Sequence, residues 1–286
     1  MAKTRRVALA IPAPTPELDH VVINVSDQLT SVSELYRRLG FQLTPRGYDT
    51  SGATHHLAVF NHTYLELLSM ATDGDHPWPY PPGLSGLAWK TGDADAVYQH
   101  LQRQDLDGDA PASFGQPLAR NDSSEPEAQF RTVPLRPALV ANGRSFFCQH
   151  LTPQAIWQPA RQQHPNGVSD ISEFVIVAQD PARVVQVYCQ LFGSHRILAG
   201  LDGAFTLRAG VATVRFAATS YMENRFGGLP ADYQGEPRMA ALSLQTGELS
   251  KTRASLLRGD IPFREQPDAI VVDASRAFNL ALRFHL

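Results

Sequence analysis

The sequence predicts an α+β fold built from four units of one kind, each with the order strand, helix and three strands (βαβββ). The first observation is a buried strand at 18–25, followed by apolar residues at helical spacing and then by two strands around a short turn. The second is that two separate segments recur later in the chain at nearly one offset, about 153 to 155 positions. Together they predict two tandem domains in an A-B-A-B order, each a curved mixed sheet.

The length and composition fit two domains of ordinary size. Of the 286 residues, 43% are hydrophobic and 19% are charged, so the chain can bury real cores. The formal net charge of -3 and the scattered basic residues give no reason to expect nucleic acid or an anionic membrane as a partner. The expected partner is therefore a small molecule or another protein.

The cysteines and the apolar runs bear on location. Only Cys148 and Cys189 are present, without CxxC spacing, which excludes a disulfide framework and a structural zinc cluster. No run approaches the ~20 apolar residues of a membrane-spanning helix. The prolines within residues 1–16 interrupt the short apolar run there, so we interpret this segment as an extended arm and not as a signal peptide. We expect a cytoplasmic protein.

The first unit spans residues 18–70. Asp27 is expected to cap a helix whose apolar residues recur at helical spacing until Gly40. An Asn61-His62 turn joins the last two strands. The expected strands are 18–25, 41–43, 54–60 and 63–70.

The second unit runs from a strand at 84–90 to a closing strand at 144–151. Asp93 is expected to start its helix. The polar stretch 105–131, rich in Gly, Pro, Ser and Asp, is expected to hold short irregular strands. The segment 152–167 is the natural linker to the second domain.

The second half of the chain repeats the first. Residues 171–177 correspond to 18–24, and Asp180 corresponds to Asp27. The fourth unit copies the second, since 246–248 repeat 91–93. We therefore divide the chain into an arm at 1–16, a first domain at 17–160 and a second domain at 161–286.

Two ionisable residues stand inside apolar strands. His20 lies in the run 18–25, and Glu66 lies in the run 63–70. A lone ionisable group in a buried strand is costly unless something neutralises it. A shared divalent metal would do so, because imidazole plus carboxylate is a common ligand set for first-row metals. The alternative is a satisfied core histidine and a rim glutamate.

Four motifs stand out in the chain: Leu18-Asp19-His20, Tyr64-Leu65-Glu66-Leu67, the stretch 146–153 and His164-Pro165-Asn166-Gly167. With these motifs the chain resembles the vicinal oxygen chelate superfamily, which includes glyoxalase I, extradiol dioxygenases, and the fosfomycin and bleomycin resistance proteins. The match looks closest to the glyoxalase-like domain proteins of that superfamily. The resemblance covers most of the chain, well for the first domain and weakly for the second.

The resemblance implies that the first and fourth strands of each unit supply metal ligands from inside a curved sheet. His20 and Glu66 match two of these positions, and Glu66 can be either a ligand or the catalytic base. In the second unit the first-strand position falls on Gly86, which cannot ligate, and the fourth-strand position falls on Gln149 or His150.

The third ligand is the open question. Strict alternation from Phe147 would turn Gln149 inward, because successive strand residues face opposite sides, whereas a one-residue bulge would turn His150 inward. We favour His150 because imidazole is the better ligand. His55 and His56 are the reserve candidates, with a surface or packing pair as their alternative.

The corresponding positions in the second domain do not form a metal set. They are Glu173, Ala241 and Arg215, and a guanidinium cannot ligate a cation. We infer that the second domain has lost any metal site.

The expected function is that of a metal-dependent enzyme, a lyase, isomerase or dioxygenase acting on a small substrate with vicinal oxygens. Its cofactor would be one divalent ion, Zn, Fe, Mn or Ni, held by His20, Glu66 and His150. The alternative is a metal-free protein of the bleomycin-resistance type that binds or sequesters a small molecule. The sites can be completed within one chain or across a homodimer. Candidate aromatic residues for the mouth are Trp78, Tyr80, Trp89 and Trp157, with ordinary core and loop packing as their alternative, which we favour for Trp89.

Cys148 is a weaker candidate, as a nucleophile. It stands two positions from His150, but most lone cysteines in strands are core residues.

Overall fold

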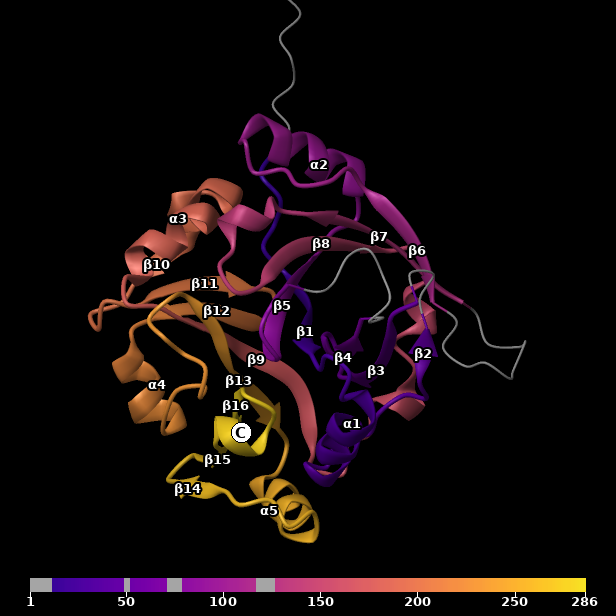
Figure 1. Cartoon of the computed structure of the whole chain (residues 1–286), viewed down its shortest axis with the longest axis vertical. Helices are drawn as coiled ribbons and strands as arrows, with labels where there is room; N and C mark the ends of the chain where they lie inside the picture. Colours follow the sequence, from indigo (N-terminus) through magenta and orange to yellow (C-terminus); the bar gives the residue numbers. More distant parts are fainter. Residues whose placement is uncertain (1–11, 49–51, 71–78, 117–126) are drawn as a thin grey trace, which may run out of the picture.

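The described residues form two eight-stranded sheets that lie next to each other (Figure 1). The computed structural model describes residues 12–48, 52–70, 79–116 and 127–286. Each sheet combines parallel and antiparallel pairs, so the predicted α+β class with curved mixed sheets is confirmed.

The first sheet holds two βαβββ units. Their elements are β1 (Leu18–Asn24), α1 (Leu29–Arg38), β2 (Gly47–Tyr48), β3 (Thr54–Val59), β4 (Tyr64–Ser69), β5 (Gly83–Lys90), α2 (Ala94–Arg103), β6 (Ala112–Gln116), β7 (Ala128–Pro134) and β8 (Arg144–His150). The strand order is β2-β3-β4-β1-β5-β8-β7-β6. Within each unit the first strand pairs in parallel with the fourth, and the two first strands, β1 and β5, pair antiparallel.

The second sheet repeats this arrangement. Its elements are β9 (Val168–Val177), α3 (Pro181–Phe192), β10 (Ile197–Ala199), β11 (Phe205–Ala209), β12 (Ala212–Ala217), α4 (Thr219–Phe226), β13 (Arg238–Thr246), α5 (Leu249–Arg258), β14 (Arg264–Gln266), β15 (Ala269–Val272) and β16 (Ala281–His285). The order β10-β11-β12-β9-β13-β16-β15-β14 matches the first sheet strand for strand. The helix α4 has no counterpart in the described part of the first sheet.

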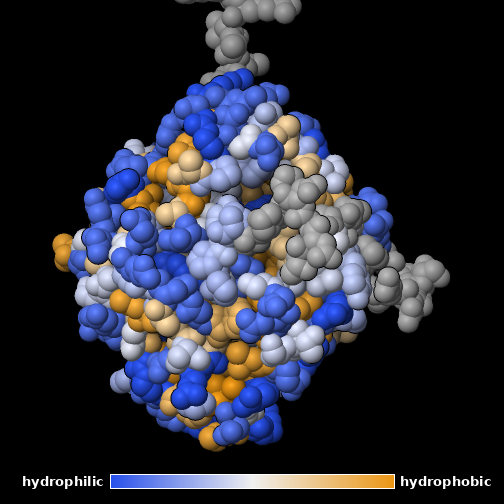
Figure 2. Space-filling model, viewed as in Figure 1, coloured by the Kyte–Doolittle hydropathy of each residue, from blue (hydrophilic) through white to orange (hydrophobic). Residues whose placement is uncertain are grey.

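The connections add short 3₁₀ helices, and the surface is mixed. The 3₁₀ helices are Pro137–Leu139, Pro153–Ala155, Pro159–Arg161, Ser194–Arg196 and Ala274–Arg276. The face seen in Figure 2 is largely polar, with small apolar patches between polar residues. Within the described ranges, no helix has the length and apolar character needed to cross a membrane.

Two of the expected elements differ from the structure. Asp27 does not cap α1, because the cap position is Gln28 and no side chain caps there. Residues 41–43 form no strand, since the Phe41 amide donates to the Tyr36 carbonyl at the end of the helix and its ring is buried beside Tyr36. By contrast, Asp93 and Asp180 do cap α2 and α3, as the sequence predicts.

One apolar core joins the outer faces of both sheets and the helices that cover them. Trp89 of β5 packs edge to face against Phe192 of α3, with ring centroids 4.7 Å apart. The Tyr36 hydroxyl of α1 donates to the Ala277 carbonyl at 3.2 Å. The inner face of each sheet, on the side away from this core, carries its own smaller clusters, and the candidate site residues lie on the inner face of the first sheet.

Candidate metal centre

A β-bulge in β1 places two neighbouring residues on one face. The register of β1 against β5 shifts between Leu18 and His20, so Asp19 is the extra residue. In such a bulge two residues oppose one on the partner strand, and simple alternation is lost. Leu18 and Val21 consequently lie in the shared outer core, while Asp19 and His20 both reach the inner face.

His20 is fixed from several sides. Its Nδ1 lies 2.6 Å from Asp19 Oδ2, and its Nε2 lies 3.9 Å from Glu66 Oε2. The ring stacks on Tyr64 with centroids 4.3 Å apart and an interplanar angle of 15°. Phe146 meets it edge-on at 5.4 Å. With its Nδ1 taken by a carboxylate, the imidazole presents Nε2 toward Glu66.

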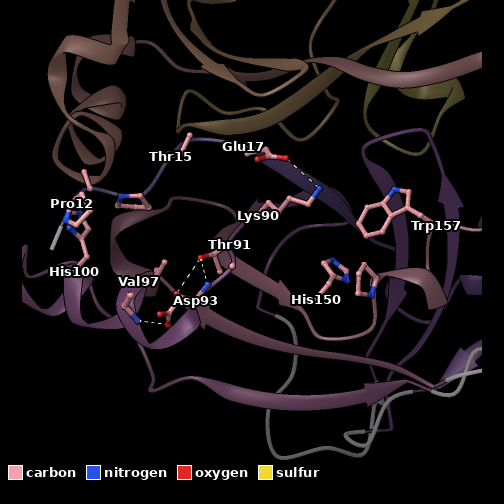
Figure 3. A pocket seen from close by; sticks show the side chains of 15 residues that line it. Pro12, Thr15, Glu17, Lys90, Thr91, Asp93, Val97, His100, His150 and Trp157 are labelled. Atoms are coloured by element: carbon pink, nitrogen blue, oxygen red, sulfur yellow. Dashed lines mark hydrogen bonds and ion pairs between the residues drawn. The ribbon is translucent and has the colours of Figure 1, made fainter.

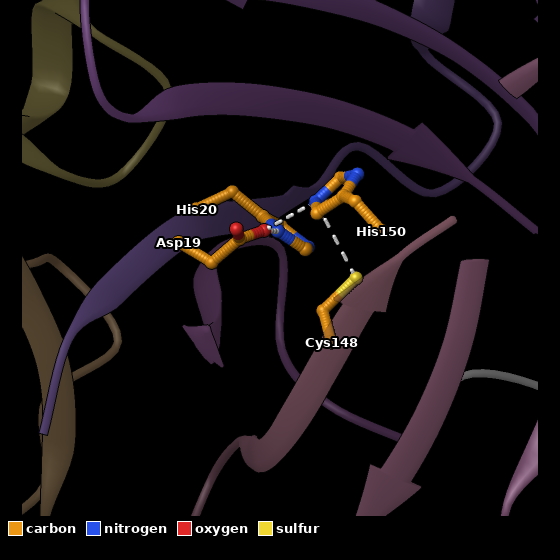
Figure 4. Close-up of side chains that lie close together, drawn as sticks. All are labelled: Asp19, His20, Cys148 and His150. Carbon is orange, nitrogen blue, oxygen red and sulfur yellow. Dashed lines mark hydrogen bonds and ion pairs between the residues drawn. The ribbon is translucent and has the colours of Figure 1, made fainter. Parts of the chain in front are cut away.

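His150 reaches the same face by plain alternation along β8. Phe147 lies in the shared outer core, and Gln149 bonds to the Ala94 amide and the Gly92 carbonyl at the start of α2. The assumption that Phe147 faces inward was therefore wrong, and no bulge in β8 is needed. His150 Nε2 lies 2.9 Å from Asp19 Oδ2 (Figure 4).

Asp19 is the common partner of both imidazoles. Burial alone would raise the pKa of its carboxyl, but the charges and hydrogen bonds of His150 and His20 outweigh burial and hold that pKa well below its usual value. The group is thus a carboxylate, and the nitrogens His20 Nδ1 and His150 Nε2 are the donors to it. Its other oxygen, Oδ1, is buried and has no hydrogen-bond partner among the described residues.

Cys148 lies beside the cluster without forming a nucleophile and base pair. Its Sγ is 3.6 Å from His150 Nε2, the same nitrogen that bonds Asp19 (Figure 4). In a catalytic arrangement the nucleophile and the orienting carboxylate bind different nitrogens of the imidazole base. Burial, together with the charges of Asp19 and Glu66, raises the pKa of the thiol well above its usual value.

Further side chains of the inner face come from β4, β8 and the segment before β5. Arg144 lies on the same side of β8 as Phe146, with its guanidinium carbon 4.3 Å from that ring's centroid. Burial lowers the pKa of Arg144, while the nearby Tyr80 and Glu66 partly restore it. An arginine remains charged under such conditions. The sequence did not single out Asp19, Tyr64 or Arg144 as residues of the site. For Arg144 a signal was available, since it stands two positions before Phe146 in the same strand and so faces the same side.

The second unit offers no ligand from its first strand. A Cβ built on Gly86 would lie 2.6 Å from the Cβ of Val22, so β1 and β5 could not approach this closely with a larger residue there. Ligands at this end of the first sheet therefore have to come from β1, β4 and β8.

The reserve histidines lie elsewhere. His56 Nδ1 lies 2.8 Å from the Thr44 carbonyl oxygen, and burial lowers the pKa of this histidine. His55 is fully buried and packs against Gly47, where a Cβ would lie 2.2 Å from its Nε2. His164, from the linker motif, accepts from the Gln42 amide and bonds the Val59 carbonyl. These contacts hold loops in place.

The aromatic residues considered for the mouth of the site differ in where they lie. Trp157 lies beside the site, with its ring 5.0 Å from that of His150. The Tyr80 carbonyl accepts from Asn24 Nδ2 at 2.7 Å. Trp89 is fully buried in the outer core, and Trp78 lies outside the described residues.

In the second sheet the corresponding positions carry an ion pair. Arg215 Nε donates to Glu173 Oε1 at 2.8 Å, the Tyr221 hydroxyl donates to the same oxygen at 2.7 Å, and Ser243 donates to the other. Burial alone would raise the pKa of Glu173, but the hydrogen bonds from Tyr221, Arg215 and Ser243 bring it below its usual value.

Four side chains of the first sheet have the composition of a metal site. One potential ligand atom from each lies within 4.8 Å of the others; these residues are Asp19, His20, Cys148 and His150. Of the predicted ligands, His20 and His150 belong to this group, and Glu66 Oε2 faces the remaining nitrogen of His20 at 3.9 Å.

Solved structures share the fold at low sequence identity. A hypothetical protein from Staphylococcus aureus is 13% identical, with a TM-score of 0.63, over 94% of this chain and 98% of that protein. A mutant of 4-hydroxymandelate synthase from Streptomyces coelicolor is 12% identical, with a TM-score of 0.58, over 95% of this chain and 92% of that one. The chain also matches 51% of a xylose isomerase-like TIM barrel/4-hydroxyphenylpyruvate dioxygenase fusion protein, at 11% identity, a TM-score of 0.57 and 99% coverage of this chain.

The sequence itself identifies the family. Among curated proteins none matches. Residues 18–192, more than half of the chain, match the family described as Glyoxalase-like domain. With the two sheets of paired βαβββ units, this match shows that the chain belongs to the glyoxalase-like domain family of the vicinal oxygen chelate superfamily.

Proposed function

We propose that the chain is a metal-dependent enzyme in which His20, Glu66 and His150 hold one divalent ion. The observations that support this most are that both imidazoles meet at Asp19 Oδ2 on the inner face of the first sheet, and that His20 Nε2 lies 3.9 Å from Glu66 Oε2. A two-histidine, one-carboxylate set suits Fe, and imidazole also suits Zn and Ni while carboxylate suits Mn.

The donor set fits such an ion. A carboxylate behind a ligating histidine fixes its tautomer and raises its basicity, and Asp19 takes this place behind His20. His150 would exchange its hydrogen bond with Asp19 for the ion. The side chains of His20, His150 and Glu66 are 4%, 6% and 11% exposed, so little water competes for them.

The chemistry divides between the ion and the chain. When bound, the ion would coordinate two adjacent oxygens of the substrate and stabilise an enolate or alkoxide. Glu66 is suited to take a proton from the substrate, in place of or in addition to ligation. Tyr64 and Phe146 confine the His20 ring, and Arg144 adds a positive charge that favours a substrate that becomes anionic. Lyase, isomerase and dioxygenase reactions all use these elements.

Metal analysis tests the proposal. The purified chain, incubated with Mn, Fe, Ni or Zn and then desalted, is expected to retain about one ion per chain. His20→Ala is expected to abolish retention, and Glu66→Ala and His150→Ala to weaken it strongly. Gln149→Ala is the matched control, because Gln149 neighbours His150 on β8 but faces α2. Retention of no ion by the wild-type chain would overturn the proposal.

A metal-free binding function is the second candidate. The observation in its favour is that Asp19 holds one nitrogen of each histidine, while Tyr64, Trp157 and His150 bring their rings together. Such a lining suits an apolar ligand. Ligand-induced thermal stabilisation that EDTA leaves unchanged would favour this function, and stabilisation that requires metal would favour the enzyme.

A further inference from the structure

A pocket of about 690 Å³ lies between the arm at residues 12–17, the first turns of α2 and the end of β8 (Figure 3). Its volume is within the range of ~300–1,000 Å³ typical of small-molecule sites. His150 lines this pocket and also bonds Asp19. The pocket therefore reaches the candidate metal centre through one shared side chain.

The walls are mainly apolar. The arm and α2 contribute Pro12, Pro14 and Val97, and the segment after β8 contributes Pro153 and the Trp157 ring. The Trp157 ring meets His150 edge-on, with centroids 5.0 Å apart. An apolar ring in this pocket would lie against a tryptophan and an imidazole at once.

The charges of the pocket disfavour an anion. Apart from histidines, the charged side chains among the described lining residues are one cation, Lys90, and two carboxylates, Glu17 and Asp93. The Lys90 ammonium is 3.4 Å from Glu17 Oε1 and 5.1 Å from the centroid of the Trp157 ring, so it is already compensated. Figure 3 shows this ion pair beside Trp157. A bound carboxylate would add to the excess negative charge, whereas a neutral or cationic molecule would not.

We infer that this pocket binds an apolar, ring-containing organic molecule without negative charge, whose ring contacts Trp157 and His150. The inference needs no metal, so it stands or falls separately from the proposed enzyme. If both this inference and the proposed enzyme hold, the molecule in the pocket contacts His150, which is also a ligand of the ion.

Three naphthalene probes of nearly equal size test the inference on the full chain in EDTA. Isothermal titration is expected to give saturable binding of naphthylmethanol and naphthylmethylamine, and at least about tenfold weaker binding of naphthoate. Naphthylmethanol is also expected to shift the NMR signals of the His150 ring. Naphthoate binding as tight as that of the alcohol, or no saturable binding of any probe, would overturn the inference.

Two variants test whether the probe binds in this pocket. Ala96→Phe fills the pocket from α2 and is expected to weaken naphthylmethanol binding at least about tenfold. Ala254→Phe is the matched control, because Ala254 is also a half-buried helical alanine but lies on α5, outside the pocket lining; its affinity is expected to stay within about twofold. Equal affinities of these two variants would contradict the assigned place.

Lys90→Gln gives a charge-specific result that does not depend on filling the pocket. Removing the ammonium leaves Glu17 without its ion-pair partner and makes the pocket more negative, so naphthylmethylamine is expected to bind several-fold tighter and naphthoate weaker, with naphthylmethanol little changed. A uniform change for all three probes would contradict the charge argument. The metal content of Ala96→Phe is expected to equal that of the wild type, which separates a failure of the pocket from a failure of the metal centre.

Discussion

At the scale of single residues, Asp19 connects the two histidines of the candidate centre through one oxygen. Its Oδ2 accepts from His20 Nδ1 at 2.6 Å and from His150 Nε2 at 2.9 Å, and the side chain is fully buried. The positions and tautomers of both imidazoles therefore depend on one carboxylate. The β-bulge in β1 turns this carboxylate and His20 to the same face of the sheet, although the two residues are neighbours in sequence.

Removing Asp19 is expected to weaken the metal centre without removing a predicted ligand. Asp19→Ala should lower divalent-metal affinity about 10- to 100-fold, as measured by competition with a chelator. Asp19→Asn should lower it less, because the amide oxygen still accepts a hydrogen bond.

The same variants give a metal-free readout. In the apoprotein, nitrogen NMR should find His20 protonated at Nδ1, and this should persist in Asp19→Asn but not in Asp19→Ala. Unchanged metal affinity and an unchanged His20 tautomer in Asp19→Ala would contradict the role given to Asp19.

The sequence led to part of this site. A polar residue within an apolar strand was enough to single out His20 and Glu66, and ligand chemistry was enough to prefer His150. Asp19 could not be found in this way, because alternation places it opposite His20 and the bulge depends on how β1 pairs with β5. The sequence also could not show which side of β8 Phe147 faces, because its ring packs in the core shared with the second half of the chain, and this packing is a tertiary effect.

At the scale of elements, the helix α4 is a difference between the second sheet, which carries it, and the described part of the first. Its Met222 and Phe226 are buried among small residues of the second sheet's inner face, including Ala217, Ala241 and Ala281. Tyr221, from the same helix, bonds Glu173 of β9. The helix thus packs on the second sheet over the position that corresponds to His20 in the first.

The duplication was readable from sequence, but α4 was not. The repeats at 171–177 and 246–248 gave the element order of the second half, because strand and helix patterns recur at fixed offsets. A single helix of eight residues occurs once and has no repeat to align with. The strand β2 could not be predicted either, because it has only two residues and forms by pairing with β3.

The Glu173 network predicts a pH dependence of stability. Because the folded pKa of Glu173 lies below its ordinary value of 4.5, its contribution is fully present above about pH 4.5 and is lost as the pH falls through the folded pKa. Glu173→Gln should therefore lower the free energy of unfolding by about 1–3 kcal/mol at pH 7, and by less below pH 4.5. Denaturant titrations at several pH values measure this. A difference between variant and wild type that is constant with pH would contradict it.

At the scale of the whole molecule, the two halves share their core. Trp89 and Phe147 of the first sheet meet Phe192 of α3, and Phe41 meets Phe284 of β16. The family match extends to residue 192, so it includes α3 together with the first sheet. Neither half buries its outer face without the other.

This shared core predicts that the chain unfolds as one unit. Calorimetry should show one cooperative transition, and Trp89→Ala should shift the whole transition by about 3–5 kcal/mol, because the side chain is fully buried between the halves. Two resolved transitions, with only one moved by Trp89→Ala, would show that the halves are independent.

The two sheets thus share one topology and differ in what their inner faces carry. The first presents His20, Glu66 and His150, and the second presents an ion pair beneath α4. We propose that this difference is a divalent metal centre in the first half only.

Anomalous diffraction from a crystal soaked in Mn²⁺ or Ni²⁺ tests this claim most directly, because it locates the ion. We predict one strong peak per chain, between His20 Nε2 and Glu66 on the inner face of the first sheet, and its loss in His20→Ala. A peak held by Cys148 and Asp19 away from Glu66, a peak in the second sheet, or no peak at all would contradict the account.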